Sequence, residues 1–536
     1  MKANVRRTVT VRQATIDLLR GFGMTTVFGN PGSTELPFLA DWPADFRYIL
    51  GLQEASVVAM ADGYARATGR AAFCNLHSAA GLGHALGNVF TAFRNQAPLV
   101  ISAGQQTRRL LPMQPFLGAV DAASFPKPYV KWSCEPARAE DVPAALAHAY
   151  YVAMQKPYGP TFVSIPSDDW SAQTHPLAPR IVSSEMAPDP ELISRLTASL
   201  NEAKRPAFVI GPEVDLEEAG DAAIALAERV RAAVWTSPFA SRVGFPERHP
   251  LFAGFLPAAP QAVSDMLSPY DLIVVLGAPM FTFHVAGECA LFAGPAPLFQ
   301  LTADGESAAT APAGTSIIGS VRSGIEALVR QIAPATRKAP AGRKQPRAPK
   351  ATNPISAEFL MHVLSQVRPA NAIVVEEAPS HRPAMQDHLP MLGYGSFYTM
   401  ASGGLGYALP AAVGVALAKP ANPVICLIGD GSAMYSLQAL WTAVQQRLPV
   451  AVIVINNSGY GAMRSFSRVL GVQGAPGIDV PGLDFVRLAQ GMGCPALRVE
   501  QADDLPLALR KPFEATGPFL VEVVVDQAIP RLYETD

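Results

Sequence analysis

The chain has 536 residues, which is enough for about three domains of ordinary size. Its formal net charge of −2 argues against a nucleic-acid partner, and its hydrophobic content of 49% allows large buried cores. No apolar run is long enough to span a bilayer, and five cysteines without paired spacing indicate a reducing compartment, so we expect a cytoplasmic protein without membrane association.

The predicted fold class is α/β, with three doubly wound parallel-sheet domains. We place them at residues 1–180, 190–335 and 355–536, because the outer blocks repeat a unit of strand, Gly-rich turn and helix. Residues 336–354 combine basic side chains with prolines and have no apolar face, which indicates a solvated linker. Strands expected in the middle domain are Ala207–Ile210, Ala233–Trp235, Leu272–Leu276 and Pro297–Leu301.

Several residues that could act in chemistry also have ordinary structural explanations. Ser33 follows a Pro-Gly pair, where a hydroxyl is normally only a cap. Glu54 follows the apolar run Tyr48–Leu52 and opens a helical stretch, a position that acidic residues favour for electrostatic reasons. His77 and His284 each lie in a mostly apolar setting, and a lone histidine is usually structural, although it can exchange protons near neutral pH.

The segment around Gly404 has only part of a dinucleotide-binding fingerprint and no clear strand before it. We therefore do not expect NAD, and the middle domain carries no positive signal for FAD.

The most informative motif is Gly429-Asp430-Gly431-Ser432, followed 24 residues later by Asn456-Asn457. It closes the apolar run Val424–Ile428, and the asparagines close a second run, Val450–Ile455, with an amphipathic helix between them. Asp430 and Asn457 thus lie just past the carboxyl ends of two parallel strands, where ligands bind. Carboxylate and amide oxygens suit Mg²⁺, and the glycines let the backbone approach phosphates, so the motif predicts a metal-bound diphosphate.

This spacing resembles the signature of thiamine diphosphate (ThDP) enzymes. The resemblance runs nearly end to end and is strongest to the benzoylformate decarboxylases. It includes Val27–Phe38, Phe46–Ala55, Asn75–Gly81, Ser102–Arg108, Val130–Ser133, Gly403–Val415 and Gly429–Ala443.

The resemblance implies ThDP and Mg²⁺ as cofactors. The metal would be held by Asp430, Asn457 and the carbonyl of Gly459. The carbonyl of Gly403 would hold the 4′-amino group, Leu405 would support the bend of the cofactor, and Glu54 would contact the ring nitrogen N1′. Further cofactor-binding residues implied are Gly429, Gly431, Ser432, Tyr460 and Ser380.

The resemblance also implies three polar residues around the substrate. Ser33 would bind the substrate carboxylate, His77 would assist addition and protonation at the first adduct, and His284 would protonate the enamine after CO₂ leaves. His84 and His381 have no catalytic counterpart and are interpreted as packing or rim residues.

The expected substrate pocket departs in part from the family pattern. Pro379 stands where a threonine is usual, Thr399 replaces a phenylalanine, and Phe116 and Met463 each replace a leucine. Changes of one or two methylenes alter selectivity by only about 1–3 kcal/mol, so an aromatic preference remains expected without fixing the acid. The full expected lining is Phe116, Leu117, Pro379, Thr399, Ala462, Met463 and Phe466.

The implied activity is non-oxidative decarboxylation of an aromatic, benzoylformate-like 2-oxo acid to an aldehyde and CO₂ through a ThDP enamine, as in mandelate breakdown. The alternatives are a ThDP carboligase or lyase, resembling acetohydroxyacid synthase or 2-hydroxyacyl-CoA lyase, and a cofactor-binding protein without turnover. Glu54 and the metal motif fall in different domains, and the family resemblance implies that a homodimer joins them, paired into a homotetramer. The expected partner is a small-molecule 2-oxo acid.

Overall fold

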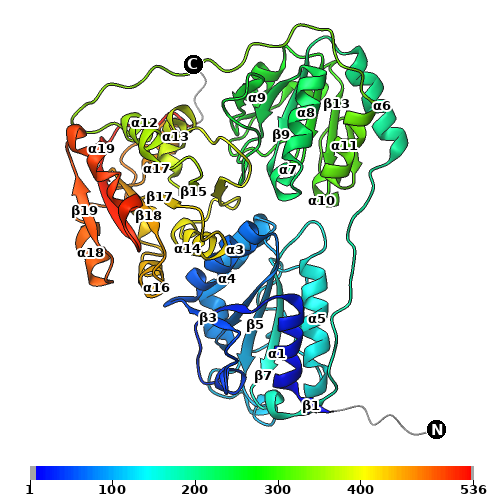
Figure 1. Ribbon diagram of the computed structural model, residues 1–536, viewed down its shortest axis with the longest axis vertical. Coiled ribbons are helices and arrows are strands. Elements are labelled where there is room, and N and C mark those ends of the chain that lie inside the picture. The colour runs from blue at the N-terminus through cyan, green and yellow to red at the C-terminus, as the bar shows by residue number, and fades with distance from the viewer. Residues whose placement is uncertain (1–7, 533–536) are drawn as a thin grey trace.

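The computed structural model describes residues 8–532 and contains three parallel six-stranded sheets, each with helices packed against it (Figure 1). The α/β class with three parallel-sheet domains is therefore confirmed. A short antiparallel pair, β1 (Val9–Thr10) with β8 (Gln173–Thr174), joins the two ends of the first domain.

The first domain has the strand order β3-β2-β4-β5-β7-β6. Helices α1 and α5 cover one face of this sheet, and α3 and α4 cover the other (Figure 1). Its strands are β2 (Thr26–Gly29), β3 (Arg47–Leu50), β4 (Ala72–Leu76), β5 (Leu99–Gln105), β6 (Ser133–Cys134) and β7 (Thr161–Pro166). Its helices are α1 (Val11–Phe22), α2 (Leu36–Leu39), α3 (Glu54–Thr68), α4 (Ser78–Arg94) and α5 (Val142–Ala153).

The middle domain has the order β11-β10-β9-β12-β13-β14, and all four strands expected from sequence are present. The edge strands β11 and β14 were not anticipated, because each is only four residues long and interrupted by exposed or half-buried positions. The strands are β9 (Pro206–Ile210), β10 (Ala233–Thr236), β11 (Phe252–Phe255), β12 (Leu272–Leu276), β13 (Leu298–Thr302) and β14 (Thr315–Ile318). The helices are α6 (Pro190–Glu202), α7 (Pro212–Leu216), α8 (Gly220–Val230), α9 (Pro260–Leu267), α10 (Gly305–Ala309) and α11 (Val321–Gln331).

The third domain has the order β16-β15-β17-β18-β20-β19, which is the order of the first domain repeated. The strands are β15 (Ile373–Glu377), β16 (Phe397–Thr399), β17 (Val424–Gly429), β18 (Val450–Asn456), β19 (Ala496–Val499) and β20 (Phe519–Val524). The helices are α12 (Ala357–Val367), α13 (Arg382–His388), α14 (Ala408–Ala418), α15 (Asp430–Ala433), α16 (Ala439–Gln445), α17 (Gly461–Val469), α18 (Phe485–Gly491), α19 (Leu505–Ala508) and α20 (Lys511–Glu514).

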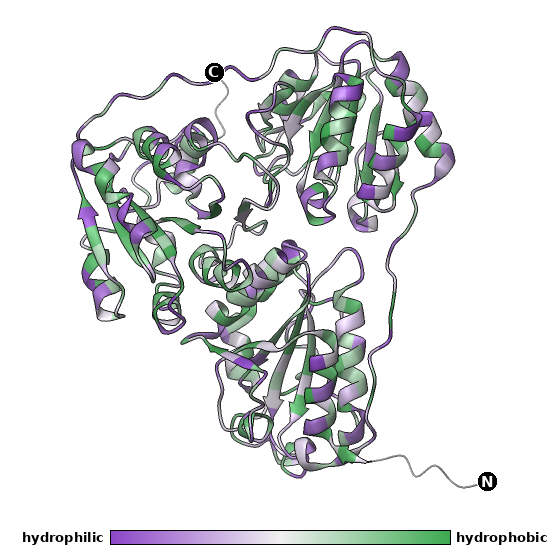
Figure 2. Ribbon diagram, viewed as in Figure 1, coloured by the Kyte–Doolittle hydropathy of each residue, from purple (hydrophilic) through white to green (hydrophobic). Residues whose placement is uncertain are grey.

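The central strands of the third domain show why continuous apolar runs fold this way. Every residue of β18 is buried, and β17 is buried up to its last residue, Gly429. Parallel strands covered by helices on both faces need such runs, and Figure 2 shows the strands as predominantly hydrophobic. The helix expected after Asp430 is in fact two short helices, α15 and α16, because turns at residues 434–438 interrupt it.

Helices α3 and α14 bring the first and third domains into close contact at two glycines (Figure 1). A Cβ atom on Gly63 would lie 2.2 Å from the carbonyl oxygen of Ala411, and one on Gly414 would lie 1.9 Å from that of Met60. Side chains at either position would force the helices apart, so the glycines fix the spacing between the two domains.

The linker contains no helix or strand between residues 332 and 354, but the structure corrects the expectation that it is simply solvated. Arg337 donates hydrogen bonds to the carbonyl oxygens of Val230 and Leu200, both at 2.8 Å. Arg343 donates to the carbonyl of Gln386 and forms an ion pair with Asp387. These two arginines attach the linker to the middle and third domains.

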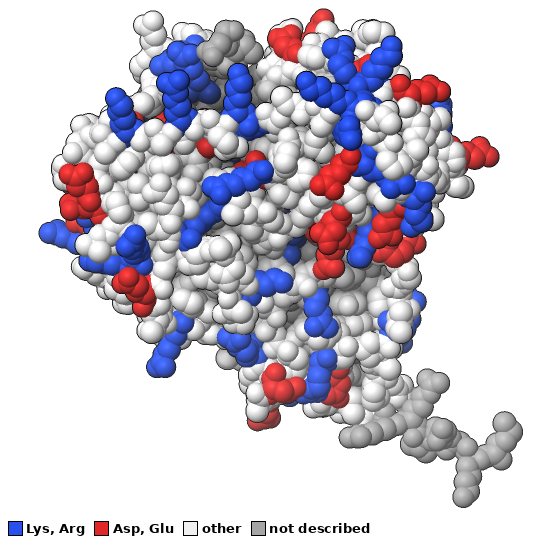
Figure 3. All heavy atoms as spheres, turned by 45° about the horizontal axis from the view of Figure 1, so that its top comes forward, with Lys and Arg blue, Asp and Glu red and all other residues white. Residues whose placement is uncertain are grey.

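The surface carries both signs of charge. Figure 3 shows Lys and Arg side chains interspersed with Asp and Glu over the face in view. Among residues 8–532, no helix is both long and apolar enough to cross a membrane.

Candidate active site

The Gly-Asp-Gly-Ser motif lies at the carboxyl end of β17, where α15 begins. Asp430 is 3% exposed, and its carboxylate accepts hydrogen bonds from the backbone N–H of Gly431 at 2.7 Å and of Gly459 at 3.0 Å. Burial raises the pKa of Asp430 and thereby favours the neutral acid. A cation bound beside the carboxylate would oppose this effect and favour the charged form. The carboxylate is thus held rigidly in a place that suits a metal ion.

The groups next to Asp430 suit Mg²⁺ better than a metal that needs several charged or sulfur-containing side chains as ligands. Asn457 is buried, and its amide nitrogen has no hydrogen-bond partner, so its amide group can turn to offer its oxygen. The described part of the chain contains no group of three or more His, Cys, Asp or Glu side chains that could hold a metal. A metal at Asp430 would therefore be completed by amide, carbonyl and phosphate oxygens, as Mg²⁺ prefers.

The segment between β16 and α14 forms a second wall of the site. Gly403 has φ +73° and open space where a Cβ would stand, so it turns the chain in the left-handed region that glycine favours. Leu405 follows and is half-buried. The buried Glu377 accepts hydrogen bonds from the backbone N–H of residues 406, 407 and 408, each at 2.7 Å. Burial raises the pKa of Glu377 to about 7, although these three donors oppose the shift.

A cavity of about 780 Å³ lies between the middle and third domains and is also lined by Phe90 and Arg94 of α4. Most of the predicted residues line it. The His284 ring lies edge-on to Phe466, with ring centroids 4.8 Å apart, and 5.7 Å from Phe239. The cavity therefore presents a histidine among aromatic rings beside the residues predicted to bind the metal. The predicted residues that line it are His284, Pro379, Ser380, Gly403, Leu405, Gly429, Asp430, Gly431, Ser432, Asn457, Gly459, Tyr460, Ala462, Met463 and Phe466.

A second group of predicted residues lies in the first domain. Glu54 is 8% exposed at the start of α3, and the Asn30 side-chain amide donates to it at 3.3 Å. The Nδ1 atom of His84 lies 3.2 Å from the other carboxylate oxygen of Glu54, and the His84 side chain is 65% exposed, as expected of a rim residue. Ser33 is exposed in the turn between β2 and α2.

His77 is the N-cap residue of α4 and is held by a buried carboxylate that the sequence reasoning missed. Its Nδ1 atom lies 2.9 Å from the carboxylate of Glu35 and 3.1 Å from the hydroxyl of Thr34. A hydrogen on Nδ1 that donates to Glu35 leaves Nε2 as the nitrogen available for proton exchange. A Cβ on Gly32 would lie 2.2 Å from this ring, which explains the glycine before Ser33.

In the sequence, the one hint that Glu35 belongs to the site is its position two residues after Ser33. It is 1% exposed, and besides His77 it accepts hydrogen bonds from the backbone N–H of Gly32 and Gly104. Its partners are up to 69 residues away in sequence, so no local pattern reveals them.

Three residues expected in the substrate pocket do not line the cavity of this chain. Thr399 is fully buried, and its hydroxyl bonds to Glu376 at 2.9 Å and accepts from Arg382 at 2.9 Å, so it serves a buried ion pair instead. Phe116 and Leu117 are 86% and 37% exposed on the loop after β5. Glu54, His77 and Ser33 are likewise absent from the cavity lining, so the predicted site residues fall into two groups, which we call half-sites: one in the first domain and one around the cavity.

His381 lines the cavity although it has no predicted role. It is 7% exposed, and burial lowers its pKa to about 4, so the ring is neutral at ordinary pH. This placement agrees with its interpretation as a packing residue.

Three family models match the chain in sequence order. Residues 9–125 match the N-terminal TPP binding domain of thiamine pyrophosphate enzymes, residues 193–328 their central domain, and residues 379–523 their C-terminal TPP binding domain. Thiamine pyrophosphate is the same compound as ThDP. The half-site with Glu54 and His77 thus falls within the N-terminal TPP binding domain, and the other combines residues of the C-terminal TPP binding domain with His284 of the central domain.

Relatives of known name cover nearly the whole chain. Benzoylformate decarboxylase of Pseudomonas aeruginosa is 46% identical over 519 residues, covering 96% of this chain and 98% of that protein. Acetolactate synthase isozyme 1 large subunit of Escherichia coli is 26% identical, covering 98% of this chain and 95% of that protein.

Solved structures of similar proteins superpose along almost the full length. Benzoylformate decarboxylase from Polynucleobacter necessarius has a TM-score of 0.94 and 39% identity, covering 98% of this chain and 100% of that one. A ThDP-dependent 4-hydroxybenzoylformate decarboxylase from Rhodococcus jostii RHA1 has a TM-score of 0.93 and 43% identity, covering 97% and 99%.

Proposed function

Because this chain belongs to the thiamine pyrophosphate enzyme family, we propose that it decarboxylates an aromatic 2-oxo acid to an aldehyde and CO₂ without oxidation. The observation that supports this best is the cavity between the middle and third domains. In it, His284 lies beside two aromatic rings, and the same cavity is lined by the residues that would bind the metal. An aromatic acid would stack against such rings while its keto group faces the cofactor.

Bound ThDP would supply a nucleophilic carbon and an electron sink for the electrons left by departing CO₂. Asp430, Asn457 and the Gly459 carbonyl would hold Mg²⁺ against the diphosphate, with Ser380, Gly429, Gly431, Ser432 and Tyr460 around it. Gly403 would accept a hydrogen bond from the 4′-amino group through its carbonyl, and Leu405 would fill the space under the bend.

The chain's own acid and base groups would move the protons. Glu54 would share a proton with N1′, which promotes loss of the proton at the reactive carbon. His77 would exchange a proton at the substrate oxygen through Nε2, because Glu35 engages Nδ1. His284 would deliver the proton that replaces CO₂, and Ser33 would bind the substrate carboxylate before it leaves.

We also propose that two chains form the minimal active unit, paired into a tetramer in the cytoplasm. Each half-site is bordered by exposed apolar side chains, which a second copy could bury: Leu52, Phe116 and Val120 near the first, and Met434, Tyr435, Met463 and Leu470 near the second. Phe116 and Leu117 would then reach the substrate of the neighbouring chain's site.

A turnover assay tests the proposed reaction. Purified protein with ThDP and Mg²⁺ is given benzoylformate, 4-hydroxybenzoylformate, pyruvate and a branched aliphatic 2-oxo acid, while CO₂, aldehyde and carboligated products are measured. We expect aldehyde and CO₂ in equal amounts, fastest with an aromatic acid, and loss of both after chelation of Mg²⁺. Carboligated product as the main outcome with pyruvate would favour a synthase, and no turnover with any acid would contradict the proposal. Aromatic aldehyde formation would also support a place in mandelate breakdown.

A further inference from the structure

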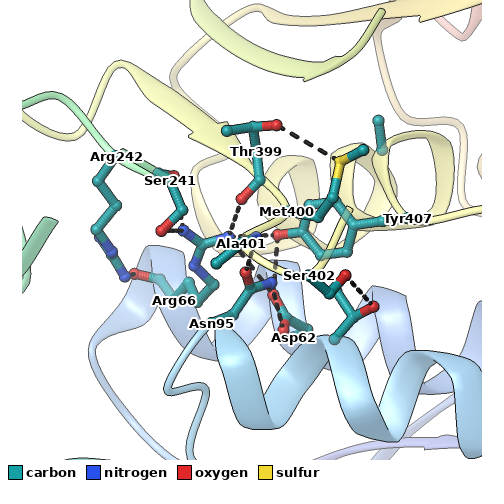
Figure 4. Close-up of polar contacts among 12 residues, drawn as sticks. Asp62, Arg66, Asn95, Ser241, Arg242, Thr399, Met400, Ala401, Ser402 and Tyr407 are labelled. Carbon is teal, nitrogen blue, oxygen red and sulfur yellow. Dashed lines mark hydrogen bonds and ion pairs between the residues drawn. The ribbon is translucent and has the colours of Figure 1, made fainter. Parts of the chain in front are cut away.

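A buried cluster of polar side chains joins all three domains close to the cofactor-binding segment (Figure 4). Arg66 lies at its centre and is fully buried, with Asp62 3.8 Å away one turn earlier on α3. The Arg66 guanidinium donates to the carbonyl oxygens of Ser241 at 2.7 Å and Thr399 at 2.9 Å. Arg242 donates to the carbonyl of Arg66, so the middle domain is attached from both directions.

Tyr407 connects this cluster to the start of α14. Its hydroxyl donates to Asp62 at 2.8 Å and accepts from Arg66 at 2.7 Å, and the residue is fully buried. Burial raises the pKa of both Tyr407 and Asp62, and the Tyr407 hydroxyl is hydrogen bonded to both charged side chains, Asp62 and Arg66. Substituting one member therefore removes a hydrogen bond from a buried neighbour.

Helix α4 holds the same segment from a second side. The Asn95 side chain accepts from the backbone N–H of Ala401 at 2.8 Å and donates to Asp62 at 3.0 Å. The hydroxyls of Thr91 and Ser402 are hydrogen bonded at 2.9 Å. The third-domain segment from Thr399 to Tyr407 is thus tied along its length to side chains of the first domain.

Asn88 links this segment directly to the catalytic end of α3. Its side-chain amide donates to the carbonyl of Ala55 at 2.9 Å and to that of Gly406 at 3.2 Å. Ala55 adjoins Glu54, and Gly406 adjoins Leu405. Glu54 and His77 therefore lie at the N-terminal ends of α3 and α4. Residues nearer the C-terminal ends of the same helices hold the predicted cofactor-binding segment of their own chain.

We propose that these six side chains, the Arg66 network (Asp62, Arg66, Asn88, Thr91, Asn95 and Tyr407), position Gly403 and Leu405 for the ThDP bound by the same chain. The inference rests on the proposed function and its two-chain site. In the dimer, α3 and α4 of one chain then serve both active sites: Glu54 and His77 act in one, and the network shapes the other. The six are positioning residues, because none of them lines the cavity that would hold the cofactor.

Cofactor binding without substrate gives the first test. Tyr407→Phe removes one hydroxyl from the network, and Thr91→Val removes the hydroxyl bound to Ser402. We expect calorimetric titration with ThDP and Mg²⁺ to show binding weakened about tenfold for Tyr407→Phe and about threefold for Thr91→Val. Thr161→Val is the matched control, because that buried hydroxyl bonds only to the carbonyls of Leu99 and Ala149, away from the segment. Equal affinities in all three variants would overturn the proposal.

Mixed dimers then show which site the network serves. In one dimer, Tyr407→Phe and Glu54→Gln occupy the same chain, beside a wild-type partner. The single live site then contains the altered segment, so its activity should need about tenfold more ThDP. In the other dimer the two substitutions lie on different chains, the live site keeps a normal segment, and its ThDP requirement should match wild type. A raised ThDP requirement in the second dimer alone, or equally in both dimers, would contradict the assignment. A general loss of stability would raise the requirement in both dimers alike.

A third dimer separates this proposal from the one on which it rests. Glu54→Gln on one chain and Asp430→Ala on the other should restore one intact site if the halves come from different chains. Failure to recover activity would refute the two-chain site. Recovery, together with unaltered ThDP requirements in both Tyr407→Phe dimers, would refute the Arg66 network alone.

Discussion

The first and third domains have the same strand order, and each places its predicted functional residues at the carboxyl ends of its strands, yet the two sets differ in chemistry. After β4 of the first domain comes His77, and after the equivalent β17 of the third comes Asp430. Glu54 follows β3, whereas Gly403 follows β16. One copy of the fold thus presents acids and bases, and the other presents oxygen ligands and open backbone.

The difference shows that the sheet fixes where a ligand binds but not what is done to it. The carboxyl ends of parallel strands are the common location. The side chains that follow each strand decide between proton transfer and phosphate binding. Substitutions at equivalent positions should therefore fail in different ways.

The largest effect is expected from Asp430→Ala. It removes the charged ligand and leaves metal and diphosphate charge uncompensated, so ThDP binding should be lost rather than slowed. Calorimetric titration at limiting Mg²⁺ measures this directly. A variant that still binds ThDP as tightly as the wild type would remove Asp430 from the metal site.

Glu54→Gln should behave in the opposite way. The amide keeps the size of the side chain but cannot share a proton with N1′, so most of the binding should survive while deprotonation of the cofactor slows by about 10²–10⁴-fold. Exchange of the cofactor's C2 hydrogen for deuterium, followed by NMR, reports this step. An unchanged exchange rate would refute the proposed role of Glu54 in cofactor deprotonation. Loss of ThDP binding would show that Glu54→Gln and Asp430→Ala fail in the same way.

His77→Ala and His284→Ala should separate early from late proton transfers. General acid–base groups contribute about 10²–10⁴-fold, so both losses should be large. Single-turnover kinetics with an aromatic 2-oxo acid should show His284→Ala slow after CO₂ release and His77→Ala slow from the first addition. If the rings only pack, turnover per folded site would stay near wild type while stability falls.

The smallest effect concerns His381, which is buried in the third domain, whereas His77 lies beside the carboxylate of Glu35. Burial lowers the pKa of His381 to about 4 from the usual histidine value of 6.5, so the unfolded chain takes up a proton first as pH falls. Stability linked to this ring is complete above pH 6.5 and is lost between pH 6.5 and 4, by up to about 3 kcal/mol. His381→Asn should therefore lose less thermal stability than wild type between pH 7 and 5. Identical pH profiles would contradict this.

The sequence was sufficient where the signal was local. The apolar runs that became β17 and β18 ended at Asp430 and Asn457 as expected, because period and turn chemistry are readable within a few residues. Prediction from sequence failed where contacts between residues far apart in the chain determine the position of a side chain. Glu35 reaches His77 across 42 positions, and Thr399 turned toward a buried ion pair although a phenylalanine counterpart suggested the pocket. Arg337 and Arg343 of the linker bond to the folded domains because carbonyl oxygens of distant segments lie within reach. The composition of the linker does not reveal these carbonyl groups.

Sedimentation of the enzyme while it turns over tests the central claim most directly, because the claim requires that half-sites from two chains meet. Activity should migrate only with species of at least two chains, each of 56.7 kDa, and should disappear on dilution to the single chain. Full activity sedimenting at the mass of one chain would contradict the account, since Glu54 and Asp430 would then have to meet within a single molecule.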